Sequence, residues 1–160
     1  MNKDHNQMIE DLYNEMFQHM ISYAKTALPV ALAEEAVQET FRIACQRAEV
    51  LAQSENPKGW LIVALRNTIR NIRRNQESTK RILAKFLATQ ISDIGVTEDS
   101  IGLEVMYQNI ADMEDYKLLK EKVLEGKSHA EMADARGITV EACKKRVERA
   151  KKSLRNKIEL

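Results

Sequence analysis

Apolar residues recur at steps of three and four along most of the chain, a pattern that predicts amphipathic helices. In the N-terminal half, three such stretches cover residues 8–28, 33–48 and 56–74, with a polar loop predicted at residues 49–55. Asn56 is a favourable N-cap for the third helix, and the proline that follows it suits the first helical position. We therefore expect three helices that share one core.

Residues 77–102 are predicted to link two helical domains. A short apolar-periodic stretch, from Ile82 to Leu87, gives way to a segment rich in Ser, Asp, Gly and Thr. We expect a transient or docked helix in the first half of this linker and an acidic loop in its second half. Beyond the linker, the apolar pattern predicts helices at residues 103–111 and 114–124.

The clearest local pattern lies near the C-terminus and indicates a helix-turn-helix. Ser128 and Glu131 have the spacing of a capping box at the start of a short helix, and Gly137 suits the tight turn that follows. Thr139 is the predicted cap of a longer basic helix over residues 140–156. A short helix, a glycine turn and a basic helix form a motif whose second helix enters the major groove of DNA.

The composition favours an all-α fold with two small helical domains, at residues 1–76 and 103–160. Only 5 glycines and 2 prolines occur among 160 residues, too few for the turns of a many-stranded sheet.

No stretch of the sequence approaches the roughly 18 apolar residues of a membrane span, and the N-terminus lacks the apolar region of a signal peptide. We therefore expect a cytoplasmic protein without membrane insertion. Cys45 and Cys143 lack metal-ligand spacing, and both are predicted to be buried.

Charge is distributed in alternating blocks, although the chain carries a net charge of only +1. Residues 1–55 hold 4 Lys and Arg against 9 Asp and Glu (net −5), and residues 56–90 hold 8 against 1 (net +7). Residues 91–125 hold 3 against 9 (net −6), and residues 126–160 hold 10 against 5 (net +5). Each basic block is suited to a phosphate backbone, which each acidic block would repel.

Both basic blocks contain a helix with opposed apolar and polar faces. On the third helix, Leu61 and Leu65 are predicted to face the core, together with Trp60. Its polar face consists of Arg66, Asn67, Arg70, Asn71, Arg73 and Arg74. On the last helix, the residues predicted to pack inward are Cys143, Val147, Ala150 and Leu154. The basic residues predicted to lie outward or on the flanks are Lys144, Lys145, Arg146 and Arg149.

Three sequence segments occur in the order and spacing of a known family. They are LAEEAVQETF at residues 32–41, NPKGWLIVALRNTIRNIRRN at residues 56–75 and SHAEMADARGITVEACKKRVERAKKSLR at residues 128–155. On these segments the chain resembles an extracytoplasmic-function sigma factor of the sigma-70 family. The resemblance implies two helical domains, regions 2 and 4, that bind core RNA polymerase and read the minus-ten and minus-thirty-five promoter elements. It implies no cofactor, no metal ligand and no catalytic residue.

The same resemblance implies roles for three sets of residues. Contacts to the β′ clamp helices of core polymerase are implied for Glu35, Gln38, Glu39 and Arg42. Contacts to the minus-ten element are implied for the polar face of the third helix, and the loop at residues 49–55 is similar to the loop that captures a flipped base. Contacts to the minus-thirty-five element are implied for Lys144, Lys145, Arg146 and Arg149. The β flap and an anti-sigma factor are further implied partners.

Other classes of function stay open on the sequence alone. A self-sufficient helix-turn-helix repressor would bind duplex DNA without polymerase, although its ligand-binding or dimerising module does not require the basic helix at residues 56–74. An anti-sigma factor would leave the basic helices unexplained. An enzyme is not expected, because His5, His19 and His129 lack the spacing of a helical di-iron site. The sequence also lacks a glycine-rich phosphate loop, and none of its Ser or Cys residues shows a partnering histidine.

Overall fold

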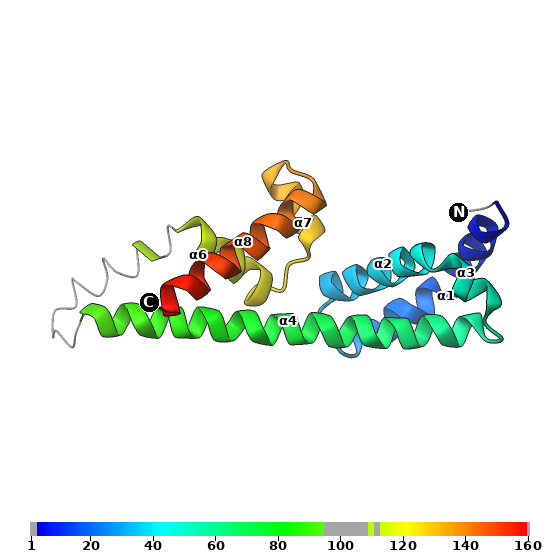
Figure 1. Ribbon diagram of the computed structural model, residues 1–160, viewed down its shortest axis with the longest axis horizontal. Coiled ribbons are helices and arrows are strands. Elements are labelled where there is room, and N and C mark those ends of the chain that lie inside the picture. Colours follow the sequence, from blue (N-terminus) through cyan, green and yellow to red (C-terminus); the bar gives the residue numbers. More distant parts are fainter. Residues whose placement is uncertain (1–2, 95–108, 111–112, 160) are drawn as a thin grey trace. The chain divides into compact units, whose positions relative to one another are not determined.

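The computed structural model describes residues 3–94, 109–110 and 113–159, with no side chains described for residues 91–94. Throughout these ranges the regular secondary structure is helical (Figure 1), which confirms the predicted all-α fold. The chain divides into two compact units, residues 1–74 and 75–160. Most of the helix predicted at residues 103–111 lies outside the described residues, apart from one short helical piece at residues 109–110.

The first unit contains three helices and the N-terminal part of α4. The helix bounds are α1 Lys3–Lys25, α2 Val30–Gln46, α3 Ala48–Gln53 and α4 Pro57–Ile94. The predicted N-cap of α4 is confirmed, because Asn56 Oδ1 accepts a hydrogen bond from the Gly59 backbone N–H at 3.0 Å. This contact fixes where α4 begins.

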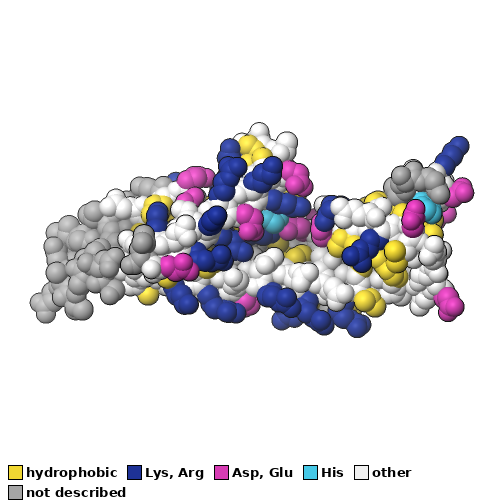
Figure 2. Space-filling model, viewed as in Figure 1, with side chains coloured by type: hydrophobic (Ala, Val, Ile, Leu, Met, Phe, Trp, Pro, Cys, Tyr) yellow, Lys and Arg dark blue, Asp and Glu magenta, His cyan; other side chains and the backbone are white. Residues whose placement is uncertain are grey.

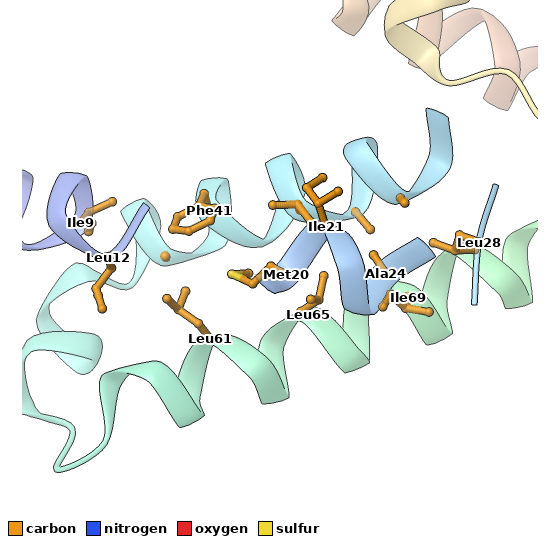
Figure 3. Packing of buried hydrophobic residues seen from close by; sticks show 14 of the residues in the cluster. Ile9, Leu12, Met20, Ile21, Ala24, Leu28, Phe41, Leu61, Leu65 and Ile69 are labelled. Carbon is orange, nitrogen blue, oxygen red and sulfur yellow. The ribbon is translucent and has the colours of Figure 1, made fainter. Parts of the chain in front are cut away.

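The core of the first unit lies between α1, α2 and α4 (Figure 3). Met20 from α1 and both Leu61 and Leu65 from α4 are fully buried, and Phe41 from α2 is nearly so. Trp60 packs against the edge of this core and is half-buried. Because burying one leucine stabilises a fold by roughly 1.5–3 kcal/mol, these contacts hold the helices together.

The prediction of a loop at residues 49–55 is wrong over most of its length, because α3 occupies residues 48–53. Ala48 and Leu51 pack into the first core, and Leu51 is fully buried. A helix of one to two turns is unstable alone, so the burial of these two side chains sustains it. The connection to α4 is correspondingly short.

The prediction that Cys45 is buried is also wrong, whereas Cys143 is buried as expected. Near its end, α2 directs Phe41 and Ala44 into the core. Cys45 is one position beyond Ala44, which turns its side chain about 100° around the helix axis and out of the core.

α4 does not end near Arg74 as predicted, but continues as a helix to Ile94. Beyond the first unit its buried apolar residues include Ile82 and Phe86, which belong to the core of the second unit. The first half of the predicted linker is therefore a docked helix, one of the two forms that we expected. Its end, residues 95–102, lies outside the described residues.

The second unit combines the rest of α4 with three described helices, which surround a core of their own. The helix bounds are α6 Glu114–Val123, α7 His129–Arg136 and α8 Val140–Glu159. Its largest fully buried side chains are Phe86, Leu119, Met132 and Leu154, one from each helix. Gln76 Nε2 donates a hydrogen bond to the Lys122 carbonyl at 2.9 Å, which ties α4 to α6.

Candidate nucleic-acid interface

The polar face of α4 in the first unit forms a basic surface, which we call the α4 surface. Its exposed side chains are Arg66, Asn67, Arg70, Asn71, Arg73 and Arg74. They lie opposite the buried Leu61 and Leu65, so the predicted orientation of this helix is confirmed. Figure 2 shows Lys and Arg side chains along α4. Among the described residues, none of the four guanidinium groups is paired with a carboxylate.

α7, a tight turn and α8 form the predicted helix-turn-helix. Ser128 Oγ accepts a hydrogen bond from the Glu131 backbone N–H at 3.1 Å, and Glu131 Oε2 accepts one from the Ser128 N–H at 3.3 Å, which confirms the capping box. Gly137 has a φ of 64°, in the left-handed region where glycine carries no Cβ penalty. Thr139 Oγ1 then caps α8 by accepting from the Ala142 N–H at 3.1 Å.

α8 presents basic side chains on the side away from its core, and we call them the α8 surface. The inward-facing residues are Cys143, Val147, Ala150 and Leu154, all buried as predicted. Lys145, Arg146 and Arg149 are exposed. Lys144 differs, because it is half-buried and its Nζ lies 3.8 Å from Glu141 Oε1. The charge of Lys144 is thus partly balanced within α8.

The four residues predicted to contact polymerase lie along one face of α2. Gln38 and Arg42 are exposed, and Glu35 and Glu39 are half-buried. Arg42 and Glu39 form a two-point ion pair, with Nη2 2.5 Å from Oε1 and Nε 2.8 Å from Oε2. This pair holds the charge of Arg42 directly against one of the two carboxylates of the α2 face.

Sequence reasoning missed an ionic contact that holds α7 against α6. Arg136 Nη2 lies 2.7 Å from Glu121 Oε2, and its Nε lies 3.7 Å from Glu114 Oε1. The contact with Glu121 is an ion pair rather than an aligned hydrogen bond. Arg136 is the last residue of α7, so this contact also positions the turn into α8. Helical periodicity gives no signal for a pair on different helices.

Three lysines of the second unit are buried or form ion pairs within it. Lys122 and Lys151 are only 7% and 9% exposed, with their aliphatic stems against the core. Lys127 forms ion pairs with Glu125 at 3.3 Å and Glu121 at 3.6 Å. Its hydrogen bond to Glu125, and then the charge of Glu121, raise the pKa of Lys127 above its ordinary value. Lys127 and Lys151 belong to the basic block at residues 126–160, so part of the positive charge of that block is engaged within the unit.

The structure gives no indication of a metal site, since no three His, Cys, Asp or Glu side chains in the described ranges could jointly hold an ion. In that same part of the chain, none of the helices combines the length and the apolarity that crossing a membrane requires. No protein-family model and no curated protein sequence matches this chain.

Proposed function

We propose that this protein is a sigma factor of the extracytoplasmic-function type, a cytoplasmic subunit that directs core RNA polymerase to promoter DNA and supports strand opening. The proposal rests on one observation. Each of the two separately packed units exposes a basic helical surface, on α4 and on α8, and among the described ion pairs only that of Lys144 with Glu141 neutralises part of either surface. A regulator of one duplex site needs one such surface. A factor that binds a duplex and also binds separated strands needs two such surfaces.

The two surfaces suit different forms of DNA. α8 begins at a defined cap after a tight turn, as a helix that enters a major groove does. On it, Lys145 is suited to base edges, and Arg146 and Arg149 to phosphates. The α4 surface alternates guanidinium and amide groups, which hydrogen-bond both the phosphates and the base edges of unstacked strands. We assign the minus-thirty-five element to α8 and the minus-ten element to α4.

The α2 face is the proposed contact to the β′ clamp helices of core polymerase. Glu35 and Glu39 are held on a rigid helix, and Arg42 fixes the carboxylate of Glu39 in one orientation. Fixed carboxylates favour recognition of a basic partner surface, because less side-chain freedom is lost on binding. Contact of the second unit with the β flap, and inhibition by an anti-sigma factor, belong to the same proposal.

Reconstituted transcription tests the proposal directly. The full chain is mixed with core polymerase and a pool of bacterial promoter fragments, and the 5′ ends of the transcripts are sequenced. We expect discrete start sites that share upstream sequences and require the added chain. If no such transcripts form and the free chain instead protects a palindromic operator, the protein is a stand-alone helix-turn-helix regulator and the proposal is wrong.

Charge reversal on α2 tests the contact with polymerase separately. The double variant Glu35→Lys, Glu39→Lys should weaken capture of core polymerase while helicity is retained, because neither side chain belongs to the first core. Glu10→Lys with Asp11→Lys changes the net charge equally at exposed positions of α1 and is the matched control. Equal capture by both double variants would remove the α2 assignment.

A further inference from the structure

Two buried threonines face each other within the first unit, one on α2 and one on α4. Thr40 is fully buried and Thr68 is 5% exposed. Their Oγ1 atoms lie 3.5 Å apart, with Thr40 placed to donate to Thr68. The core around them is apolar, and a hydroxyl group buried among apolar side chains costs free energy unless it is hydrogen-bonded. Burial of apolar surface therefore does not account for the threonine pair.

Each hydroxyl group is already hydrogen-bonded within its own helix. Thr40 Oγ1 donates to the Ala36 carbonyl at 2.8 Å, and Thr68 Oγ1 donates to the Ala64 carbonyl at 2.9 Å. A hydroxyl group has one hydrogen and two acceptor lone pairs. A hydrogen bond between the threonines thus requires one of them to share its hydrogen, which agrees with the long oxygen–oxygen distance. Such a shared hydrogen bond adds little to the stability of the fold.

The threonine pair gives the packing of α2 on α4 a direction that apolar contacts lack. Hydrophobic contacts are non-directional. One turn away from Thr40 on either side, α2 carries Ala36 and Ala44, which are fully buried and end in a single methyl group. These small side chains offer little resistance to a slide of α2 along α4. A polar contact buried between helices favours one alignment, as a single buried asparagine does in coiled coils.

The threonine pair also lies next to both proposed binding surfaces of the first unit. On α2, Thr40 follows Glu39 of the face assigned to polymerase, and on α4, Thr68 follows Asn67 of the α4 surface. A slide of one residue along a helix moves a side chain by about 1.5 Å. A misplacement of about 1 Å is enough to slow a reaction that depends on geometry. The alignment of α2 on α4 therefore determines how the two surfaces are placed.

We propose that Thr40 and Thr68 are positioning residues, whose hydroxyl groups hold α2 and α4 in the alignment that strand opening requires. The inference deepens the proposed function and rests on it for the partners of the two surfaces. A role in packing alone depends on the shape of the side chain, which valine reproduces. The proposed role depends on the hydroxyl group, which serine retains.

Two double variants distinguish these roles in the full chain. The valine pair is Thr40→Val with Thr68→Val, and the serine pair is Thr40→Ser with Thr68→Ser. Spin labels on the exposed Cys45 of α2 and on an Asn71→Cys substitution in α4 report the alignment by pulsed electron paramagnetic resonance, while the fully buried Cys143 is protected from labelling. The valine pair should shift or broaden the distance distribution, and the serine pair should retain that of the wild type.

The effect on strand opening is measured in the reconstituted holoenzyme. The valine pair should slow the appearance of permanganate-reactive thymines at least about fivefold, within the roughly two- to thirtyfold range of changes at coupled positions. It should retain capture of core polymerase, and the serine pair should melt the promoter at the wild-type rate. Thr79→Val is the matched control, because it removes a buried hydroxyl group of α4 that donates to the Asn75 carbonyl at 2.8 Å in the second unit. It should not change the melting rate.

Three results would overturn the inference. A wild-type distance distribution in the valine pair would show that the hydroxyl groups do not set the alignment. An altered distribution with melting at the wild-type rate would show that opening does not require it. A fall of the Trp60 urea midpoint by more than about 1 M in the valine pair would make the threonines a stabilising contact instead.

Failure of the inference is distinguishable from failure of the proposed function, because the distance measurement contains no polymerase. Promoter-dependent transcription by the wild type, with a wild-type distance distribution in the valine pair, would refute the role of the threonines alone. If the wild type supports no promoter-dependent transcription, the sigma-factor function is refuted, and the distances still decide whether the threonine pair aligns α2 with α4.

Discussion

Replacing Phe86 with alanine is expected to destabilise the second unit and to leave the first unit folded. Phe86 is only 1% exposed and packs in the same core as Leu119, Met132 and Leu154. Truncation of a buried phenylalanine removes about 3–5 kcal/mol of stability. Because a small domain has only about 5–15 kcal/mol in total, the second unit should lose a large part of its margin.

A single tryptophan allows the two units to be followed separately. Trp60 packs against the first core, so its fluorescence during urea unfolding reports the first unit. Far-UV circular dichroism reports the helices of both. With a urea slope of about 1–3 kcal/mol per molar, Phe86→Ala should lower the midpoint of the second unit by at least about 1 M. The fluorescence midpoint should not change.

Lys85→Ala is the matched control for this experiment. Lys85 is adjacent to Phe86 and exposed, so its removal should change stability by less than about 0.5 kcal/mol. If Phe86→Ala unfolds like Lys85→Ala in circular dichroism, α4 does not contribute to a second core, and the assignment of this helix segment is wrong. An equal shift of the Trp60 signal would show that the two units unfold together.

Three further predictions concern the turn and the two basic surfaces. Gly137→Ala should destabilise the second unit by roughly 1–2 kcal/mol, measured by urea unfolding. The residue has a φ of 64°, and no atom within 4 Å would obstruct an added Cβ, so only backbone strain opposes the substitution. The double variant Arg66→Ala, Arg74→Ala should fold normally, since both side chains are exposed. It should slow the appearance of permanganate-reactive thymines at the promoter, and promoter melting at the wild-type rate would contradict the role of the α4 surface in strand opening. Arg146→Ala and Arg149→Ala should each lower the slope of log affinity against log salt by roughly 0.9, measured on the holoenzyme, because both residues are assigned to phosphates. An unchanged slope in both variants would place α8 away from the DNA.

Features set by neighbouring residues were predictable from the sequence. The capping box at Ser128, the left-handed Gly137 and the N-cap at Asn56 each depend on contacts within one helical turn, and all three are present. The inward faces of α4 and α8 follow from apolar spacing in the same way. The exposure of the candidate DNA-binding residues was therefore predictable, apart from the half-buried Lys144.

Features that depend on contacts between helices were not predictable. Leu51 sustains α3 by packing into a core formed by other helices. The segment after Arg74 was predicted to be a linker whose first half is a transient or docked helix, and only the burial of Phe86 in the second core decides for the docked form. The Arg136–Glu121 ion pair joins two helices with no shared periodicity. A cleft lined by Tyr23, Arg66 and Arg70 was not predicted for the same reason, because Tyr23 lies on α1 and the two arginines lie on α4.

The burial of two lysines in the second unit has a practical consequence for chemical labelling. Lys122 and Lys151 should react slowly with amine-acylating reagents, because their side chains are packed against the core and are scarcely accessible. Exposed lysines such as Lys85 and Lys152 should react quickly and act as internal standards. Mass spectrometry of labelled peptides would then report whether the second unit is folded inside a large complex, where bulk spectroscopy is dominated by the other subunits. The two lysines thus serve as a built-in reporter of the fold around them.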